Sequence, residues 1–461
     1  MTRRFSPDAL ATALPAQPAG TRRWVAYSGG LDSSVLLEAV VKLAPGAPGL
    51  GALHVNHQLH PEADRWQAHC EATCRGLAVE FHGLRVDARP RRRESPEAAA
   101  RRARYAALAS LLQPGDTLLL GHHADDQLET VLLNLLRGSG SRGLAGMPAS
   151  RPLGVGRLHR PLLSWTRAAL LAYARDAGLT WIEDPSNAIT TADRNQLRQV
   201  VVPALRERWP DAAGRVARAA AQLDEDAGLL AELAGLDLGE AATRHPGTPV
   251  LPLARLQALS PQRRANALRA ALRARGLAPL PTGRRLREFA RQLVAARPDR
   301  GVALQWRGGT LRREGPRVWL LEALPSPPQT PMALRPDRRH EDPCGRVWLT
   351  PVAGSAAVGE CVLSAAELAA GVTLEYRSGG ERIGRGGGRR LGALLQARGI
   401  PAWLRSRLPL VRAAGQLVGV AGCHPRLNPA VPVDQAAWRV CWTPAPALLP
   451  GLAGHVGEGD L

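Results

Sequence analysis

Between residues 24 and 121, short runs of β-branched and apolar residues alternate with longer stretches whose apolar residues recur at helical spacing. The predicted strands are Trp24–Tyr27, Ala52–Asn56, Val79–Leu84 and Thr117–Leu120. The predicted helices between them are Asp32–Lys42, Glu62–Arg75 and Pro96–Leu112. This order predicts a parallel sheet with helices on both faces. Ligands of such sheets bind beyond the carboxyl ends of the strands, so polar residues that directly follow strands are candidates for chemistry.

The rest of the chain predicts a different organisation. Residues 211–296 are helical in pattern, with no strand signal, whereas residues 303–321 indicate a β-hairpin or a small meander. Four prolines between residues 325 and 331 indicate a linker, and a third unit follows. We therefore predict an α/β protein with a Rossmann-like, nucleotide-binding parallel-sheet domain, a mainly helical middle domain and a small α+β C-terminal domain. The predicted ranges are 1–212, 213–345 and 346–461, the last clearest over 371–445.

The charge of the chain indicates a polyanionic partner. Its 461 residues include 60 Lys and Arg against 40 Asp and Glu, a formal net charge of +20, and Lys42 is the single lysine. Residues 255–287 hold nine arginines and no acid, and residues 376–412 hold nine arginines against Glu381 alone. Helix faces normally mix both signs, so these runs favour RNA or DNA over a membrane surface.

Composition also bounds the compartment. Six cysteines are too sparse for a disulfide framework in a chain of this length. Prolines interrupt the apolar stretches at both ends of the sequence, so neither a signal peptide nor a membrane span is predicted. We expect a soluble cytoplasmic protein.

The first chemical motif is S-G-G-L-D-S-S at residues 28–34, which follows the first predicted strand and begins a helix. Two glycines let the backbone turn sharply and bring its N–H groups close to an anion, and the helix N-terminus adds its dipole. A phosphate-binding loop is favoured over an ordinary strand-to-helix turn capped by Ser and Asp. A Walker A loop is excluded because no Gly-Lys pair has the required spacing.

The second motif is G-H-H-A-D-D-Q-L-E-T at residues 121–130, after the fourth predicted strand. On a helix that begins near Ala124, the carboxylates of Asp125, Asp126 and Glu129 lie within one turn of each other. Clustered carboxylates suit Mg²⁺, although acids at a helix N-terminus can also simply complement the dipole. The Mg²⁺ interpretation gains weight because the first motif ends another strand of the same sheet.

Two arginine-rich clusters are further candidates for the site. Glu97, Arg101, Arg104 and Tyr105 lie at helical spacing, so that Glu97, Arg101 and either Arg104 or Tyr105 can share a face. Downstream, E-D-P-S-N at residues 183–187 precedes Arg194 and Arg198, which are four residues apart. Such a pair can bind phosphate, and the alternative is a solvent-exposed arginine face.

Taken together, the motifs resemble those of the tRNA(Ile)-lysidine synthase family. The chain contains, in the family's order, S-G-G-L-D-S-S, H-V-N-H-Q-L, E-x-x-A-R-x-x-R-Y, G-H-H-A-D-D-Q-x-E-T, R-G-S-G-x-x-G-L-x-G-M and E-D-P-S-N with R-N-x-x-R. Residues 259–313 are similar to the family's substrate-binding domain and residues 377–422 to its C-terminal domain. The first loop alone is common to N-type ATP pyrophosphatases (PP-loop proteins). His60, Arg389 and Arg390 depart from the family's usual Arg and Lys but keep basic or potentially basic groups.

The resemblance implies a two-step reaction that uses ATP and Mg²⁺. ATP adenylates the 2-oxo group of the wobble cytidine in an isoleucine tRNA with a CAU anticodon. L-Lysine then attacks through its ε-amine and expels AMP, leaving lysidine, which changes codon specificity from AUG to AUA. The residues expected to be catalytic are Asp32, Arg104, Asp126 and Arg194. The residues expected to bind ATP are Ser28, Gly29, Gly30, Leu31, Asp32, Ser33, His122, Asp125, Glu129 and Arg198. The residues expected near Mg²⁺ are Asp32 and Asp126.

Three other functions compete with this one. A tRNA thiolase would share the adenylation but needs a sulfur-carrying cysteine beside the loop. Cys70 and Cys74 are the only close pair, and their predicted helix is remote from both motifs in sequence. A non-catalytic RNA-binding protein with a degenerate nucleotide fold is disfavoured by the intact loop and acidic helix. A nucleotide amidotransferase ligase lacks its glutaminase-like cysteine motif here.

Overall fold

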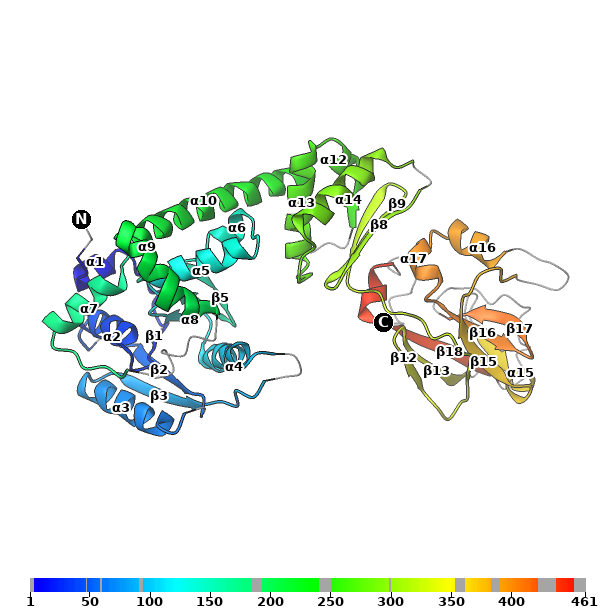
Figure 1. Ribbon diagram of the computed structural model, residues 1–461. Helices are drawn as coiled ribbons and strands as arrows, with labels where there is room; N and C mark the ends of the chain where they lie inside the picture. Colours follow the sequence, from blue (N-terminus) through cyan, green and yellow to red (C-terminus); the bar gives the residue numbers. More distant parts are fainter. Residues whose placement is uncertain are drawn as a thin grey trace. The chain divides into compact units, whose positions relative to one another are not determined.

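The computed structural model describes residues 4–46, 48–58, 60–90, 94–183, 193–239, 250–297, 300–352, 361–382, 390–421 and 437–451. The chain packs as two compact units, Met1–Leu229 and Leu230–Leu461 (Figure 1). Among the helices of these described ranges, none combines the length and apolarity that a bilayer span requires.

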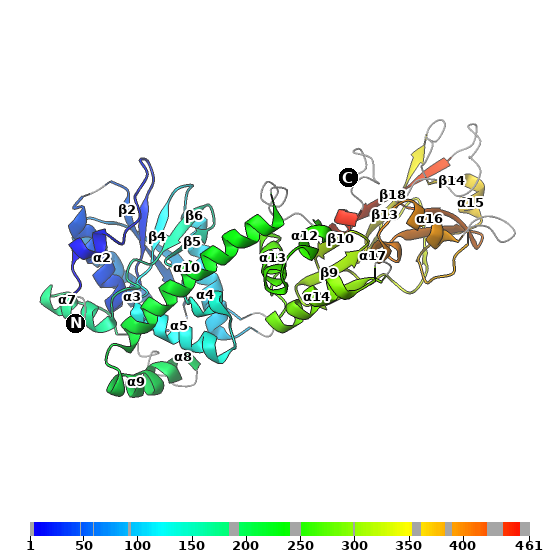
Figure 2. The ribbon, with the colours of Figure 1, turned by 90° about the horizontal axis from the view of Figure 1, so that it is seen from above.

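The first unit is built on one six-stranded sheet in the order β3-β2-β1-β4-β6-β5. Its strands are β1 Arg23–Ala26, β2 Leu50–Asn56, β3 Glu80–Arg85, β4 Thr117–Leu119, β5 Ser150–Leu153 and β6 Gly156–His159. All neighbouring pairs are parallel except β5 with β6. The four predicted strands are confirmed, and the β5–β6 hairpin, seen beside β4 in Figure 2, adds an edge that the sequence pattern did not predict.

Helices cover both faces of this sheet, as predicted. They are α1 Pro7–Ala11, α2 Leu31–Leu43, α3 Ala63–Gly76, α4 Pro96–Leu111, α5 Ala124–Leu136, α6 Ser141–Leu144 and α7 Arg167–Asp176. Successive residues of β1 point to opposite faces: Val25 packs with α2, α3 and α7, whereas Trp24 packs with α4. Burial on both sides explains why the central strands β1, β2 and β4 are mostly apolar, whereas the outer strand β3 is polar and partly exposed.

The strand order creates a switch point at the centre of the sheet. From β1 the chain adds β2 and β3 on one side and then places β4 on the other side of β1. The loops that follow β1 and β4 therefore leave in opposite directions, and ligands of such sheets generally bind at the carboxyl ends of these strands. A Cβ on Gly121, just beyond β4, would lie 3.2 Å from backbone atoms of Asp32 and Ser33, so a larger residue there would push the two loops slightly apart.

A run of short helices completes the first unit: α8 Asp193–Gln196, the π-helical turn η2 Leu197–Val201 and α9 Val202–Arg208. The long helix α10, Ala212–Leu238, follows. The motif residues 184–187 that precede α8 lie outside the described residues, as does Arg389.

The second unit begins with an antiparallel sheet in the order β7-β10-β9-β8. Its elements are β7 Val250–Pro252, β8 Val302–Trp306, β9 Gly309–Glu314 and β10 Arg317–Leu321, packed on α12 Leu253–Gln257, α13 Pro261–Ala274 and α14 Gly283–Ala295. The predicted meander is confirmed. The expectation that residues 211–296 contain no strand is wrong, because β7 exists through its pairing with β10 rather than through a pattern of its own.

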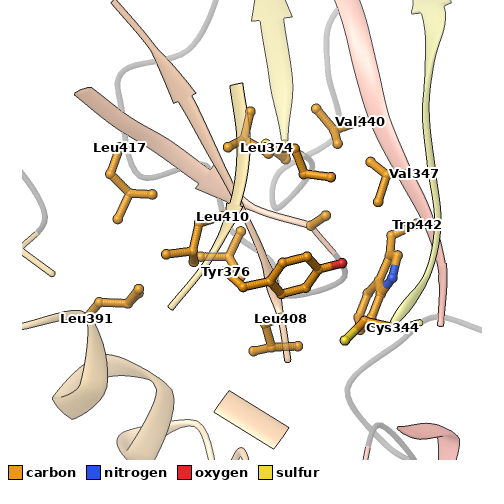
Figure 3. Close-up of a cluster of buried hydrophobic side chains, with 14 of the residues drawn as sticks. Cys344, Val347, Leu374, Tyr376, Leu391, Leu408, Leu410, Leu417, Val440 and Trp442 are labelled. Atoms are coloured by element: carbon orange, nitrogen blue, oxygen red, sulfur yellow. The ribbon is translucent and has the colours of Figure 1, made fainter. Parts of the chain in front are cut away.

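Two further antiparallel sheets share one core near the C-terminus. One consists of β11 Met332–Ala333, β15 Val372–Tyr376, β16 Pro409–Ala413 and β17 Gln416–Val420, the other of β12 His340–Asp342, β13 Gly345–Val352, β14 Val362–Ser364 and β18 Ala437–Pro444. The short helices are α15 Ala365–Ala369, α16 Leu391–Ala397, α17 Ala402–Arg405 and the 3-10 helix η3 Pro446–Gly451. Figure 3 shows Tyr376 and Leu410 of the first sheet beside Val347 and Trp442 of the second, which confirms the α+β prediction.

Candidate active site

In the loop between β1 and α2, the Ser33 hydroxyl forms hydrogen bonds with the loop's own backbone. The backbone N–H of Ser28 donates to Oγ of Ser33 at 3.2 Å, and that hydroxyl donates to the Gly30 carbonyl at 3.0 Å. Gly30 is the N-cap of the thirteen-residue helix α2, and no side chain caps it. The backbone N–H groups at the start of α2 are therefore available to an anion.

Gly29 is the position where this loop most needs a glycine. Its φ of +81° lies in the left-handed region, and a Cβ there would lie 2.6 Å from Cδ1 of Ile182 and 2.9 Å from Sγ of Cys70. The Gly29 carbonyl accepts the backbone N–H of Ile182 at 2.8 Å. The segment that leads to the E-D-P-S-N motif is therefore attached directly to the phosphate-loop candidate.

His123 joins the two motifs. Its Nε2 lies 3.5 Å from Oδ2 of Asp32 and 3.5 Å from Oδ2 of Asp126, and the residue is 3% exposed. Burial alone would lower the pKa of His123, but the charges of Asp126 and Asp32 raise it above its ordinary value. Burial would likewise raise the pKa of Asp126, and His123 and Arg194 hold it below its usual range. This pair is therefore an ion pair inside the site.

Asp126 and Glu129 bind the two arginines predicted to share a helix face. Arg194 donates from Nε to Glu129 at 2.7 Å and from Nη2 to Asp126 at 3.2 Å. Arg198 donates from Nε to Glu129 at 2.7 Å and from Nη2 to Asp126 at 3.3 Å. The pair is thus not a solvent-exposed arginine face, because α8 and η2 bring both guanidinium groups onto the acidic helix α5.

Asp125 has a different environment from its neighbours. Its Oδ2 accepts the backbone N–H of Arg167 at 2.6 Å, at the start of α7, and its Oδ1 pairs with Arg206 of α9. Although His123 Nδ1 lies 3.4 Å from Oδ2, the carboxylate is committed to holding α7 and α9 against α5. The structure therefore does not bring Asp125 to the phosphate-loop candidate in the way it brings Asp126.

Two histidines at the same sheet edge each accept a hydrogen bond from an arginine. Arg104 on α4 donates from Nε to His57 Nε2 at 3.1 Å, and Arg160, directly after β6, donates from Nε to His122 Nδ1 at 3.2 Å. Burial, together with the charge of Arg104, lowers the pKa of His57 to about 4. Burial and the charges of Arg160 and Arg194 lower that of His122 to about 3, despite the opposing effect of Asp126.

Arginines also surround Tyr105. The guanidinium carbons of Arg101 and Arg151 each lie 5.0 Å from its ring centroid. Arg101 and Tyr105 share a face of α4, as predicted. Sequence analysis missed Arg151 and Arg160 because both belong to the unpredicted β5–β6 hairpin. The side chain of Glu97 lies outside the described residues.

The cysteine that packs against the loop has the wrong chemistry for sulfur transfer. Cys70 is 0% exposed beneath Gly29, and burial raises its pKa to about 12. Reactive thiols sit in exposed, electropositive surroundings that lower the pKa. The helix α3 is remote from the loop in sequence but contacts it in space, and the contact is one of packing.

A parallel sheet with a Ser- and Gly-rich loop and an acidic helix at its switch point defines a PP-loop ATP-binding protein. The family model described as a PP-loop domain matches residues 9–205. Those described as the TilS substrate binding domain and the TilS substrate C-terminal domain match residues 251–319 and 372–442.

Curated relatives match nearly the whole chain. The tRNA(Ile)-lysidine synthase of Alkalilimnicola ehrlichii is 45% identical over 428 residues, covering 91% of this chain and 94% of the relative. That of Methylococcus capsulatus is 40% identical over 440 residues, with the same coverage. The chain belongs to the tRNA(Ile)-lysidine synthase family. This membership favours lysidine synthesis over the thiolase alternative. A solved U34-tRNA thiolase from Methanococcus maripaludis matches 48% of this chain and 78% of its own at 16% identity, with a TM-score of 0.39, too low to bear on activity.

Proposed function

We propose that this protein uses ATP to join L-lysine to the wobble cytidine of an isoleucine tRNA with a CAU anticodon. The observation that carries the proposal is the convergence of the Ser28–Ser34 loop and the acidic helix α5 at the β1–β4 switch point, in a member of this family. In the first step the cytidine 2-oxygen attacks the α-phosphorus and pyrophosphate leaves. In the second, the lysine ε-amine attacks C2, loses a proton, and AMP departs with the oxygen.

In this proposal the loop residues hold the phosphates of ATP. Ser28, Gly29, Gly30, Leu31 and Ser33 present backbone N–H and hydroxyl groups at the start of α2. Pyrophosphate is a stable leaving group only when its charge is balanced, and the helix N-terminus supplies part of that balance. His122 follows β4, and its neighbour Gly121 packs against Asp32 and Ser33 at the start of α2.

Asp32 and Asp126 fit the Mg²⁺ role in chemistry. Oδ1 of Asp32 is buried without a hydrogen-bond partner, as an oxygen reserved for a cation would be. Both oxygens of Asp126 contact His123, Arg194 or Arg198, so a metal there would replace one of these contacts. When bound, Mg²⁺ would offset negative charge on the phosphates. Within the described residues, no group of three or more His, Cys, Asp or Glu forms a complete metal site, so the phosphates of ATP would have to complete it.

The arginines are proposed to act on charge that develops at the α-phosphate. Arg194 and Arg198 are bound by Asp126 and Glu129, and the same Nε and Nη2 atoms suit a phosphate. Arg104 lies at the carboxyl edge, where its Nε donates a hydrogen bond to the imidazole of His57, and among the side chains that the structure describes no carboxylate forms an ion pair with it. We propose that Asp125 supports ATP binding only indirectly, by holding the helices that carry these groups.

The tRNA is proposed to contact the arginine-rich stretches 255–287 and 376–412 through its phosphates. The wobble base must leave the anticodon stack to reach the site, which is natural for a single-stranded loop. We also propose the three-domain division at residues 212 and 345 that the sequence pattern predicts.

The test is incorporation of radiolabelled lysine into an unmodified isoleucine tRNA transcript with a CAU anticodon. We expect label in this tRNA only with ATP and Mg²⁺, and none in methionine tRNA, the control. Pyrophosphate release without lysine incorporation would retain the adenylation and overturn lysine as second substrate. Absence of ATP cleavage with any tRNA would overturn the proposal and favour a non-catalytic RNA-binding protein.

A further inference from the structure

Arg160 is a buried cation whose side chain donates hydrogen bonds to two acceptors near the site and also interacts with Tyr105. It is 3% exposed, and Nη1 donates to the Pro148 carbonyl at 2.7 Å while Nε donates to His122 Nδ1 at 3.2 Å. Its backbone N–H donates to Ala149 at 2.8 Å. The Leu120 N–H donates to the carbonyl of His159 at 2.9 Å, which fixes the end of β4 against the end of β6.

The chemistry of this contact determines the state of the imidazole. A guanidinium group has N–H donors and no acceptor, so His122 Nδ1 must accept and cannot carry a proton. The ring is therefore neutral and carries its single proton on Nε2. A protonated ring would set two N–H donors against each other, and the lowered pKa of His122 agrees with a neutral ring.

The other ring nitrogen is available to a ligand. Nε2 of His122 makes no hydrogen bond to any residue that the structure describes. The buried polar atoms that lack a hydrogen-bond partner do not include it. His122 follows Gly121, which packs against Asp32 and Ser33. This neutral N–H donor therefore lies one residue from the contact with the phosphate-loop candidate, whose proposed ligand is rich in anionic oxygens.

We propose that Arg160 is a positioning residue that fixes His122 in the Nε2–H tautomer, so that His122 donates a hydrogen bond to an anionic oxygen of the bound nucleotide. The proposal rests on the proposed function only for the identity of that oxygen. The same arrangement, in which one partner orients an imidazole for its work with the other nitrogen, recurs around ligand-binding histidines.

The tautomer can be measured without any activity. In full-length protein labelled with ¹⁵N-histidine, long-range ¹H–¹⁵N NMR spectra distinguish protonated from unprotonated ring nitrogens, and His122→Gln identifies the His122 signals. We expect an unprotonated Nδ1 and a protonated Nε2, and a shift away from this state in Arg160→Met. A protonated Nδ1 in the unaltered protein, or a tautomer unmoved by Arg160→Met, would overturn the proposal. Lysine incorporation has no part in this readout, so failure of the proposed function would be seen separately.

Kinetics add a second readout. Arg160→Met should lower the kcat of pyrophosphate release by about 10- to 100-fold, with little change in the KM for tRNA, because losing an orienting partner typically costs that much. Arg160→Lys, which retains one donor, should recover part of the loss. The control is Arg157→Met on β6, the strand that Arg160 follows; Arg157 is an exposed arginine that donates to Ser150, and this variant should behave like the unaltered enzyme. An equal loss in both Arg160 variants and the control would contradict a positioning role.

A further pair of variants leaves Arg160 in place, in case its replacement prevents folding. The amide nitrogen of His122→Gln lies near the position of Nε2, whereas that of His122→Asn lies near Nδ1. The proposal requires Gln to retain more pyrophosphate-releasing activity than Asn. Equal activities, or a more active Asn variant, would overturn it.

Discussion

Glu129 and Arg198 form a two-pronged ion pair, in which Nε donates to Oε1 at 2.7 Å and Nη2 to Oε2 at 3.1 Å. The glutamate side chain is 3% exposed and that of the arginine 40% exposed. The buried negative charge of Glu129 is therefore balanced by Arg198 and by Arg194 rather than by solvent. The pair links the acidic helix α5 to η2, and the geometry of the site depends on it.

Replacing Glu129 with Gln should therefore destabilise the protein, because the arginines lose their charged acceptor. We expect a loss of about 1.5–3 kcal/mol in the free energy of unfolding, toward the lower end because the arginines are partly solvated. Urea denaturation measures it. The matched control is Glu71→Gln, whose pair with Arg75 is on the surface and should be worth about 0–1 kcal/mol. Equal losses in the two variants would show that the buried ion pair stabilises the fold no more than the surface ion pair does.

Replacing Gly29 with Ala should disable the loop. The methyl group would force the side-chain ends of Ile182 and the buried Cys70 to shift, in addition to the strain of the left-handed φ. Gly178→Ala is the control, since its φ of +64° is also left-handed but the space around it is open. The control should lose roughly 1 kcal/mol of stability and retain ATP cleavage, whereas Gly29→Ala should lose cleavage or the fold. Normal cleavage in Gly29→Ala would contradict the assignment of the loop.

Replacing Asp32 with Asn should remove most Mg²⁺-dependent pyrophosphate release, because the unpartnered buried oxygen is the one proposed to face the cation. We expect a fall of at least 100-fold in kcat, comparable to the loss of an electrostatic contact at a reacting centre. Pyrophosphate release measured against Mg²⁺ concentration tests it. Asp176→Asn, an exposed residue paired with Arg4, serves as the control. Full activity with an unchanged Mg²⁺ dependence would exclude Asp32 from the metal site.

The sequence predicted the parts of the fold that are encoded locally. The central strands β1, β2 and β4 of the first sheet were recognisable because burial on both faces makes them short, mostly apolar runs, and both motifs were expected at strand ends. That β1 lies beside β4 follows from strand order, which no local pattern contains. The convergence of Asp32 and Asp126 on His123 is a consequence of that order.

The sequence could not predict the contacts of residues that lie on or beside strands which the sequence pattern did not reveal. Arg160 follows β6, a four-residue strand stabilised by its pairing with β4 and β5, and β7 exists only against β10. Asp125 and Asp126 look alike in sequence, but one faces α7 and α9 and the other faces the loop. Which of two neighbouring carboxylates serves the site is decided by tertiary packing.

His57 should make stability depend on pH. Its Nε2 accepts from Arg104, and its pKa falls from an ordinary 6.5 to about 4. Between these values the unfolded chain binds a proton that the folded protein does not, so the free energy of unfolding should fall as pH drops from about 6.5 to about 4. His57→Gln should reduce that slope when urea denaturation is repeated across the window. An unchanged slope would mean that other groups dominate the acid response.

Arg269 and Arg287 should contact an RNA phosphate. Nη2 of Arg269 and Nη1 of Arg287 lie 3.7 and 3.3 Å from the position that a Cβ on Gly283 would occupy, and neither arginine pairs with a carboxylate of the described chain. Burial and the charge of Arg287 lower the pKa of Arg269, so the pair is mutually repulsive until an anion joins it. Arg287→Gln should weaken binding of the isoleucine tRNA and reduce the slope of log affinity against log salt by about 0.7–0.9.

Filter binding between about 50 and 200 mM salt measures this slope. Arg291→Gln is the matched control, because that arginine lies on the same helix but is already paired with Glu288 at 2.7 Å. Its loss should leave the slope nearly unchanged. If both variants alter the slope equally, the basic stretch acts through its total charge, and the convergence of Arg269 and Arg287 has no separate role in holding the tRNA.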